Sequence, residues 1–219
     1  IPFKAYSVLG AAHDDTPSLK NRHNLILNSK NGNVKTLYRS NEIRENHRNL
    51  LKNHTETFTW SIESSSTKDS FGNKYKERWN LSDDRGSAWL SFICSEAIKE
   101  DYKVYLSGQG ADEIFADYGF NGTKFANHSN FGGLFPKDLN SIFPWNSFYK
   151  SSQESYLAKE EYSSGMWGIE TRYPFVDKDV VQEFLWLNSD LKNKYYKSVL
   201  HNYFINNNFP FDKGRKVGF

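Results

Sequence analysis

The string KVYLSGQGADEIF at residues 103–115 combines residue types that can bind phosphate and a metal ion. A short β-branched and aromatic run leads into Gly108 and Gly110, which flank Gln109, and Asp112 lies in the first turn of a new apolar pattern. We interpret this as a strand, a tight glycine loop and a helix start, where bare backbone N–H groups and the helix dipole favour anions and a carboxylate can hold a cation. The alternative is an ordinary strand-to-helix turn whose acidic residues stabilise the first helical turn.

The composition indicates a folded domain and argues against two classes of partner. The 219 residues suffice for one sizeable domain or two small ones, and an aromatic content of 16% supplies large buried areas for a core. The net charge of +2 is too balanced to indicate nucleic acid or an anionic membrane as a partner. No apolar stretch approaches the length of a membrane span.

Cysteine and asparagine usage bears on where the protein works. The single cysteine, Cys94, excludes a disulfide framework within the chain, and we expect it to be a small buried residue on a helix rather than a reactive thiol. The chain starts at Ile1 without a signal-peptide pattern, so we expect a piece of something longer. The localisation stays open between cytoplasmic and secretory, because four sequons permit a glycoprotein without establishing one. They begin at Asn53, Asn80, Asn121 and Asn127.

Hydrophobic patterns predict an α/β fold in the first part of the chain, about residues 1–120. Strand and helix patterns alternate there, and this order predicts a parallel sheet with crossover helices. A polar stretch without periodicity at 61–82 predicts a surface loop. The predicted strands are 3–9, 34–38 and 103–106, and the predicted helices are 16–29, 41–53 and 87–99, the last capped by Asp84 or Ser87.

The rest of the chain reads as a long loop followed by a mainly helical part, about residues 151–219. Residues 121–150 are dense in Asn, Gly, Phe and Pro, and a loop of this length is typical of a lid, a binding wall or an interface. Apolar residues at helical spacing predict the helices 153–166, 178–187 and 195–207, with Asp177 capping the second.

Three blocks of this sequence closely resemble the synthetase domain of the asparagine synthetase family, which also includes the β-lactam synthetases. The blocks are LSGQGADE at 106–113, MWGIETRYPFVDKDVVQEF at 166–184, and the closing KSVLHNYF and KGRKVGF. The family patterns are LSGxGxDExFxGY, then GxExRxPFLDxxxV, then a helix opening with Lys before a Lys-rich stretch ending in GF. The order and spacing match, so the resemblance spans nearly the whole chain as one synthetase-like domain.

This resemblance implies a doubly wound parallel α/β fold of the ATP-pyrophosphatase kind and a ligase activity. Such enzymes activate a small carboxylate with ATP and Mg²⁺ as an acyl-adenylate, and an amine or ammonia then attacks to form an amide. The protein must hold the triphosphate, metal and carboxylate in line and stabilise charge on the departing pyrophosphate.

The resemblance also assigns roles to residues of the first block. Ser107, Gly108 and Gly110 would shape the loop around nucleotide and substrate. Asp112 matches a Mg²⁺ ligand, which is reasonable chemistry because a dication bound to phosphates needs only one or two carboxylates. The alternative role of Asp112 is that of an acidic residue at a helix N-terminus.

Two later residues match catalytic positions of the family. Glu170 would orient the substrate or take part in proton transfer, and an ion pair with Arg172 is the alternative. Lys197 would stabilise adenylation and pyrophosphate departure, and an ordinary lysine of an amphipathic helix is the alternative. His201, one turn beyond Lys197, would neighbour the site.

The sequence departs from the family in three ways. The nucleotide-binding loop of the SGGxDS type and the glutaminase domain with its N-terminal cysteine are absent, so we expect the chain alone to bind ATP poorly. Gln109, in the catalytic position, stands where asparagine synthetases commonly have an acidic residue and β-lactam synthetases a tyrosine. An amide cannot act as a base, although it can bind a donor or an acceptor. Ala116 and Asp117 replace the usual glycine pair before Tyr118.

Three interpretations follow from these departures. The chain is a fragment or subunit of a working synthetase, completed by a second polypeptide that carries the nucleotide loop. Alternatively, it is a catalytically degenerate relative that serves as a structural or binding subunit, secreted and glycosylated if the sequons are used. The third interpretation is a piece of an intact enzyme. A sheet lacking one strand would expose an open edge, so we expect a tight heteromeric contact with a largely apolar surface.

Overall fold

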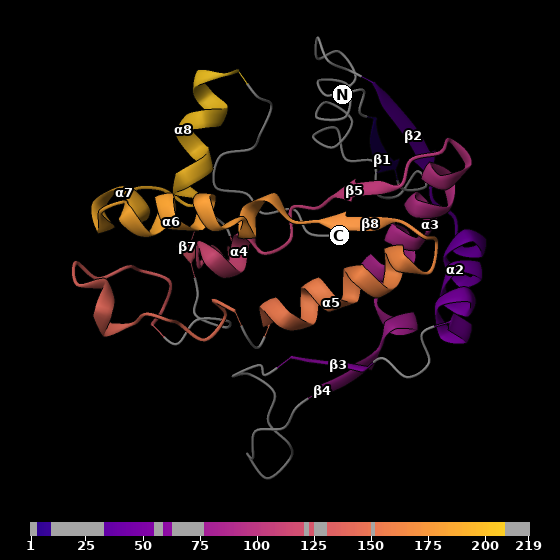
Figure 1. Ribbon diagram of the computed structural model, residues 1–219, viewed down its shortest axis with the longest axis horizontal. Coiled ribbons are helices and arrows are strands. Elements are labelled where there is room, and N and C mark those ends of the chain that lie inside the picture. The colour runs from indigo at the N-terminus through magenta and orange to yellow at the C-terminus, as the bar shows by residue number, and fades with distance from the viewer. Residues whose placement is uncertain are drawn as a thin grey trace.

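The computed structural model of the chain is a mixed assembly of short strands and helices (Figure 1). The α/β class expected from the sequence is confirmed for the residues that the structure describes. A doubly wound sheet of the ATP-pyrophosphatase kind stays a prediction, because the described strands form separate two-stranded sheets. The structure describes residues 4–9, 33–54, 59–62, 77–120, 123–124, 131–149 and 152–208.

Two parallel strands and a helix form the N-terminal layer. Strand β1 (Ala5–Leu9) pairs in parallel with β2 (Val34–Tyr38), and helix α2 (Asn41–His54) follows. These bounds confirm the predicted strands at 3–9 and 34–38 and the predicted helix at 41–53. The predicted helix at 16–29 lies outside the described residues.

A second parallel pair lies at the centre of the molecule (Figure 1). Strand β5 (Val104–Leu106) pairs with β8 (Glu170–Arg172), and the register sets the last residues of the two strands opposite each other. The carboxyl ends of the strands therefore meet at one edge, which is where ligands bind in open α/β sheets. The strand predicted at 103–106 is confirmed.

The two faces of the β5–β8 pair differ in burial. On one face, Tyr105 packs into the core cluster of helix α3 (Arg85–Lys99), and the Thr171 hydroxyl lies 2.5 Å from the Ser164 hydroxyl of helix α5 (Ser152–Gly165). On the other face, Val104 is 46% exposed and Leu106 65%. Parallel strands are normally covered on both faces, so this exposed apolar face is unusual.

Helices α3 (Arg85–Lys99) and α5 (Ser152–Gly165) pack against each other and against the β5–β8 pair. The Asp84 side chain caps α3 by accepting a hydrogen bond of 2.7 Å from the Ser87 N–H, as predicted. Cys94 on α3 is buried, and burial raises the pKa of its thiol to about 12. The prediction of a buried cysteine is therefore confirmed.

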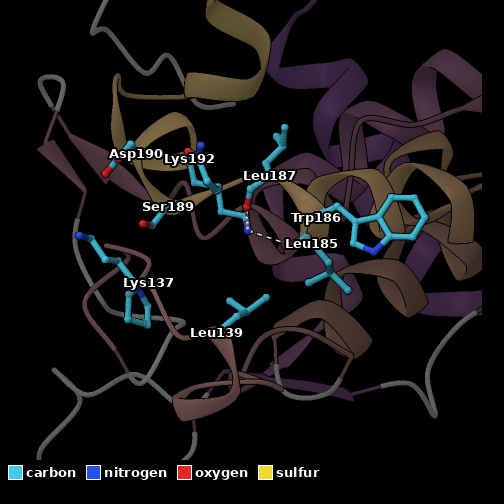
Figure 2. Close-up of a pocket in the computed structure, with 10 residues that line it drawn as sticks. Lys137, Leu139, Leu185, Trp186, Leu187, Ser189, Asp190 and Lys192 are labelled. Carbon is cyan, nitrogen blue, oxygen red and sulfur yellow. Dashed lines mark hydrogen bonds between the residues drawn. The ribbon is translucent and has the colours of Figure 1, made fainter.

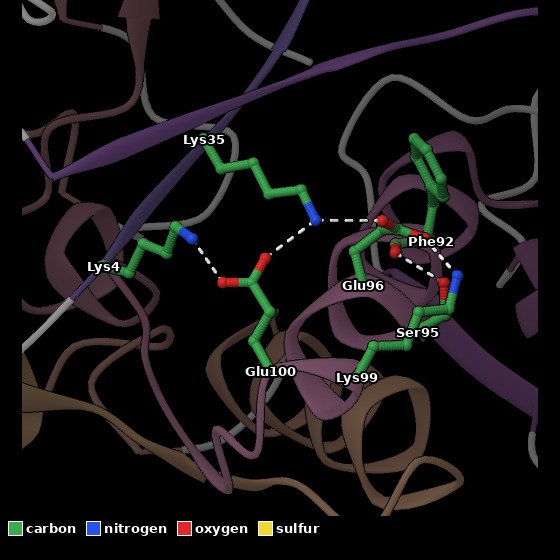
Figure 3. Close-up of polar contacts among 7 residues, drawn as sticks. All are labelled: Lys4, Lys35, Phe92, Ser95, Glu96, Lys99 and Glu100. Carbon is green, nitrogen blue, oxygen red and sulfur yellow. Dashed lines mark hydrogen bonds and ion pairs between the residues drawn. The ribbon is translucent and has the colours of Figure 1, made fainter.

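Charged contacts join α3 to the N-terminal layer (Figure 3). The Lys35 ammonium of β2 lies 2.8 Å from the Glu100 carboxylate and 3.1 Å from that of Glu96. Lys4, just before β1, also pairs with Glu100. All four side chains are partly exposed, so the contacts orient the layer more than they stabilise it.

The prediction of a loop at 61–82 is wrong at both ends of that range. Strand β3 (Thr59–Ile62) pairs antiparallel with β4 (Glu77–Asn80), and a 3₁₀ turn, η1 (Leu81–Asp83), leads on to α3. The sequence TWSI is rich in residues that favour strands, but it is short. The polar residues that follow it give no sign of a second strand that pairs with it.

The long segment predicted at 121–150 contributes to the core where the structure describes it. Phe135 and Trp145 are buried with Ile114, Phe115 and Phe184 in one aromatic cluster. The segment is therefore a wall of the core near helix α4, and a lid function stays a prediction. The elements around it are α4 (Ala111–Ile114), β6 (Gly119–Phe120), β7 (Thr123–Lys124) and η2 (Leu139–Ser141).

The remaining elements are short helices near the carboxyl edge of β5 and β8 (Figure 1). The Asp177 side chain caps α6, as predicted, by accepting a 2.9 Å hydrogen bond from the Asp179 N–H. The helix predicted at 195–207 begins later, at Ser198, and Tyr203 of its expected apolar stripe is 62% exposed. The elements are η3 (Pro174–Val176), α6 (Lys178–Trp186), α7 (Ser189–Asn193) and α8 (Ser198–Asn206).

None of the helices that the structure describes is long and apolar enough to cross a membrane. Of the sequon asparagines, Asn53 and Asn80 are exposed, and the other two lie outside the described residues. Their use as glycosylation sites stays a prediction.

A buried histidine links α2 to the core. The His47 Nδ1 atom lies 2.9 Å from the Ser91 hydroxyl, and the centre of its ring is 5.4 Å from that of Phe92 and 6.0 Å from that of Trp167. The Trp167 indole N–H donates to the same hydroxyl at 2.9 Å. Burial, assisted by the charge of Lys99, lowers the pKa of His47 below its usual value.

We predict that the free energy of unfolding falls as the pH is lowered through and below about 6.5, the ordinary histidine value. In that window the unfolded chain binds the proton that buried His47 refuses, so protonation favours unfolding. Urea unfolding between pH 7.5 and 5.5 measures the slope. His47→Gln should flatten it, and a slope that His47→Gln leaves unchanged would refute the assignment.

Candidate functional site

The loop between β5 and α4, residues 107–110, is the centre of the candidate site. We call it the glycine loop. Gly110 has a φ of 90°, a conformation that residues with a Cβ rarely adopt. A Cβ at this position would also overlap the Cγ1 atom of Val176 in η3. Gly110 therefore lets the loop turn and lets the 174–176 segment pack directly against it.

Hydrogen bonds fix the start of the loop. The buried Ser107 N–H donates to the Arg172 carbonyl at 2.9 Å, which extends the β5–β8 pairing by one residue. The Ser107 hydroxyl accepts the Gln109 N–H at 3.0 Å. A Cβ added at Gly108 would meet no atom within 4 Å, so the loop is open to an approaching group at that residue.

Lys197 and Asp112 meet at this loop. The Lys197 ammonium pairs directly with the Asp112 carboxylate, although the two residues are 85 positions apart in the sequence. Both side chains are partly exposed. Lys197 lies just before α8 with a φ of 54°, which is unusual for a lysine and differs from the helical position predicted for it.

A second charge pair lies beside the first one. The Lys124 ammonium is 2.8 Å from the Asp117 carboxylate, and both groups are buried. Burial raises the pKa of Asp117, while Lys124 and Lys197 oppose the rise. The pKa of Tyr196 is raised to about 12 by burial and by the charges of Asp112 and Asp117. The site therefore combines two carboxylates and two ammonium groups.

The departures noted before Tyr118 have structural consequences. Ala116 has a φ of 49°, a conformation for which glycine is the natural residue. Asp117 holds the buried Lys124 of β7, which also lies 5.5 Å from the centre of the Phe135 ring. The replacement of the glycine pair thus adds an anchor for the aromatic segment next to the site.

Glu170 lies on β8, two residues before the carboxyl end of the strand. Its carboxylate accepts a hydrogen bond of 2.8 Å from the Arg172 Nε–H, and both side chains are about three-fifths exposed. Hydrogen bonding and the charge of Arg172 lower the pKa of Glu170. This is the ion pair named as the alternative interpretation, and the catalytic role of Glu170 stays a prediction.

Two further sequence-based expectations concern neighbouring residues. The His201 ring stacks on the Tyr195 ring, with 4.2 Å between the ring centres. Its backbone N–H donates to the Lys197 carbonyl at 3.1 Å, so His201 neighbours Lys197 through the backbone. Gln109 is partly buried, with its backbone tied to Ser107.

Sequence reasoning missed the buried acids beneath the loop. Glu113 is fully buried; its carboxylate accepts the Tyr118 hydroxyl, and its carbonyl accepts the Trp145 indole N–H at 2.8 Å. Glu160 of α5 is also buried, and this burial raises the pKa of its carboxyl group. A sequence gives no signal for such residues, because a glutamate on a helix is normally exposed.

A pocket of about 460 Å³ lies elsewhere, between the 136–139 segment and the junction of α6 and α7 (Figure 2). Lys192 lies at this pocket, and its ammonium donates to the Leu185 carbonyl at 3.0 Å and to that of Leu187. The pocket shares no residue with the glycine loop, Asp112 or Lys197. Because Lys192 satisfies the last carbonyls of α6, we assign it a structural role.

Comparisons with known proteins agree with the motifs. Residues 83–146 match the family model of asparagine synthase. A relative described as probable asparagine synthetase (glutamine-hydrolyzing), from Schizosaccharomyces pombe, is 27% identical over 120 residues. This part of the chain resembles asparagine synthetases. The resemblance predicted from the sequence is thus confirmed over part of the chain, and the alignment covers 55% of this chain and 19% of that relative.

We predict that Gly110→Ala destabilises the protein by roughly 2–5 kcal/mol, since a left-handed residue with a Cβ costs about 1–2 kcal/mol and overpacking adds about 1–3 kcal/mol. Gly108→Ala is the matched control, because its added Cβ meets only open space. Chemical unfolding of both variants gives the comparison. Equal stabilities would contradict the described contact between Gly110 and Val176.

Proposed function

We propose that this chain is a subunit or fragment of an ATP-dependent ligase that forms an amide. The observation that carries the proposal is the meeting of Lys197 and Asp112 at the glycine loop. The synthetase resemblance requires an ammonium and a carboxylate there, and chance folding would rarely bring together two residues so distant in sequence. The match of residues 83–146 to asparagine synthase supports the same reaction class.

The proposed reaction has two steps. A carboxylate oxygen of a small substrate bonds to the α-phosphorus of ATP, and the bond from that phosphorus to the pyrophosphate oxygen breaks. An amine nitrogen then bonds to the acyl carbon, the bond from that carbon to the AMP oxygen breaks, and the nitrogen gives up a proton. Lys197 stabilises the negative charge that develops on the departing pyrophosphate.

The residues present fit a divalent cation together with phosphates. Asp112 offers a carboxylate that already attracts one cationic group, the Lys197 ammonium. Among the described residues, no group of three or more His, Cys, Asp or Glu side chains could hold a metal by itself. A Mg²⁺ ion would therefore depend on phosphate oxygens for its other ligands, which is usual for this ion, and it would neutralise their charge.

The backbone of the glycine loop serves the nucleotide and substrate in this proposal. Ser107 sets the direction of the loop through its bonds to Arg172 and Gln109. Gly108 leaves the approach open, and Gly110 makes the turn. Glu170 contributes only if its ion pair with Arg172 opens, because its carboxylate is engaged there.

A second polypeptide completes the site in this proposal. Within the described part of the chain, β5 pairs only with β8, and its apolar outer face is exposed. A strand of the second polypeptide would pair with the open edge of β5, and a helix of it would cover Val104 and Leu106. In a parallel sheet, the loop after such a strand would reach the same edge as the glycine loop, where a nucleotide loop is needed.

A non-catalytic binding or structural subunit is the second candidate function. The observation that favours it is that the charges of the site neutralise one another, Asp112 with Lys197 and Glu170 with Arg172. Gln109 carries an amide, which cannot act as a base as the carboxylate of an acidic residue would. The two candidates differ in one measurable property, which is the exchange of pyrophosphate into ATP in the presence of a carboxylate.

We predict that the chain, together with its co-purifying polypeptide and a panel of small carboxylates, catalyses ATP–pyrophosphate exchange. Lys197→Ala should lower the exchange rate about 10²–10³-fold, the loss typical of removing one stabilising donor. Lys194→Ala, an exposed lysine of the same segment, is the control and should retain the rate. No exchange in a complex that has an intact nucleotide loop would favour the non-catalytic function.

We also predict that the chain alone does not stay monomeric in sedimentation velocity experiments, because its exposed apolar face on β5 lacks a cover. Leu106→Asp should weaken the complex with the partner polypeptide, because it places a charge on the face that the partner covers. Trp186→Asp, which alters an exposed apolar residue on α6, should leave the complex intact. A stable, folded monomer would refute the partner, since an obligate contact buries about 2,000 Å² or more.

A further inference from the structure

A cavity apart from the glycine loop is not used by the proposed reaction. The pocket between the 136–139 segment and the junction of α6 and α7 has a volume of about 460 Å³. Pockets that bind small molecules have volumes of roughly 300–1,000 Å³. The pocket is therefore large enough for a ligand of its own, and its lining decides what kind of ligand that is.

The lining contains a buried ammonium group. Lys192 is only 4% exposed, and Figure 2 shows its side chain pointing in among the residues that line the pocket. Burial of an ammonium group is costly, so a buried lysine is normally paired with a carboxylate. Within the described part of the chain, Lys192 has no carboxylate partner. Its positive charge therefore lacks a full counter-charge there.

Weaker partners surround this ammonium group. It donates to the carbonyls of Leu185, at 3.0 Å, and of Leu187, and these bonds occupy two of its three N–H donors. It also lies 5.2 Å from the centre of the Phe184 ring and 5.5 Å from that of the Phe135 ring. Carbonyls and ring faces offer only partial negative charge. Burial accordingly lowers the pKa of Lys192, since none of the described carboxylates offsets it.

The rest of the lining suits an organic anion. Lys137 and Asp190 are both exposed and carry opposite charges, so Lys192 leaves the lining with an excess of positive charge. Beside these charged groups the pocket has an apolar wall, which would gain from contact with a hydrocarbon group. An inorganic anion would leave that wall in contact with water. The apolar wall consists of Pro136, Leu139, Leu185 and Leu187.

We propose that this pocket binds a small organic carboxylate, whose carboxylate group accepts the third N–H of Lys192 and whose hydrocarbon part packs on the apolar wall. A carboxylate supplies the missing acceptor and the missing counter-charge together, and hydrogen bonds between ionised groups are strong. Lys192 keeps both of its bonds to α6 in this arrangement. The inference does not rest on the ligase function, because the pocket shares no residue with the glycine loop, Asp112 or Lys197.

The test is a calorimetric titration of the full chain, together with any polypeptide that co-purifies with it. Phenylacetate and hexanoate serve as probes, and each is compared with its neutral amide. Both acids should bind, and each amide should bind about ten- to a hundredfold more weakly, which corresponds to the loss of one hydrogen bond between charged groups. No binding by either acid, or equal affinity of the acids and their amides, would overturn the inference.

Variants locate the probe within the protein. Lys192→Met removes the ammonium group and should lower the affinity for phenylacetate about ten- to a hundredfold. The matched control is Lys194→Met, which removes a nearby exposed lysine and should leave the affinity unchanged. Lys197→Ala should also leave it unchanged. Full affinity in Lys192→Met would contradict the proposal, and so would a loss in Lys197→Ala, because the probe would then bind at the ligase site.

A further variant keeps Lys192 and guards against misfolding of Lys192→Met, which also removes the bonds to α6. Ser189 lines the pocket in the first turn of α7, where an acidic residue is favourable. Ser189→Glu should weaken phenylacetate binding about tenfold or more, because its carboxylate repels the probe and competes for Lys192. Gln182→Glu, at an exposed position of α6 outside the pocket, is the control and should bind the probe normally. Equal affinities of these two variants would refute the site.

Discussion

The contact of Val176 with Gly110 is the constraint on which the rest of the site depends. It brings the turn after β8 onto the loop after β5, and only a residue without a side chain allows it. Phe115 and Phe175 then pack edge to face, with 5.9 Å between their ring centres, and Phe184 joins them from α6. This packing carries the chain toward α8 and delivers Lys197 to Asp112. The ion pair itself contributes little stability at its exposure, so its position results from the packing around it.

One face of the β5–β8 pair serves stability, and the other face serves function. The covered side holds buried polar residues, including Ser107, Thr171 and Glu160. The other side exposes the apolar side chains of β5 and the ion pair between Glu170 and Arg172. A parallel pair of this kind is normally covered on both faces, so covering the exposed side would add apolar burial.

Much of the fold was predictable, because local patterns decide it. The β-branched and aromatic residues of VKTLY indicated β2, and the cap at Asp177 indicated the start of α6. The β3–β4 hairpin was missed because its pairing depends on partners that no local pattern reveals. The meeting of Lys197 with Asp112 came from the family motifs, not from periodicity, which placed Lys197 inside a helix. Glu160 was beyond prediction, because its burial depends on how α5 packs against the loop.

Self-neutralisation of the site limits which ligands it can bind. Phosphate oxygens would compete with Asp112 for the Lys197 ammonium, and a dication would compete with Lys197 for the Asp112 carboxylate. Each exchange alone leaves one charged group without its partner. If phosphate and a dication arrive together, the new pairs replace the old one. On the proposed function, the two charges would therefore favour a ligand that carries both phosphate and a dication.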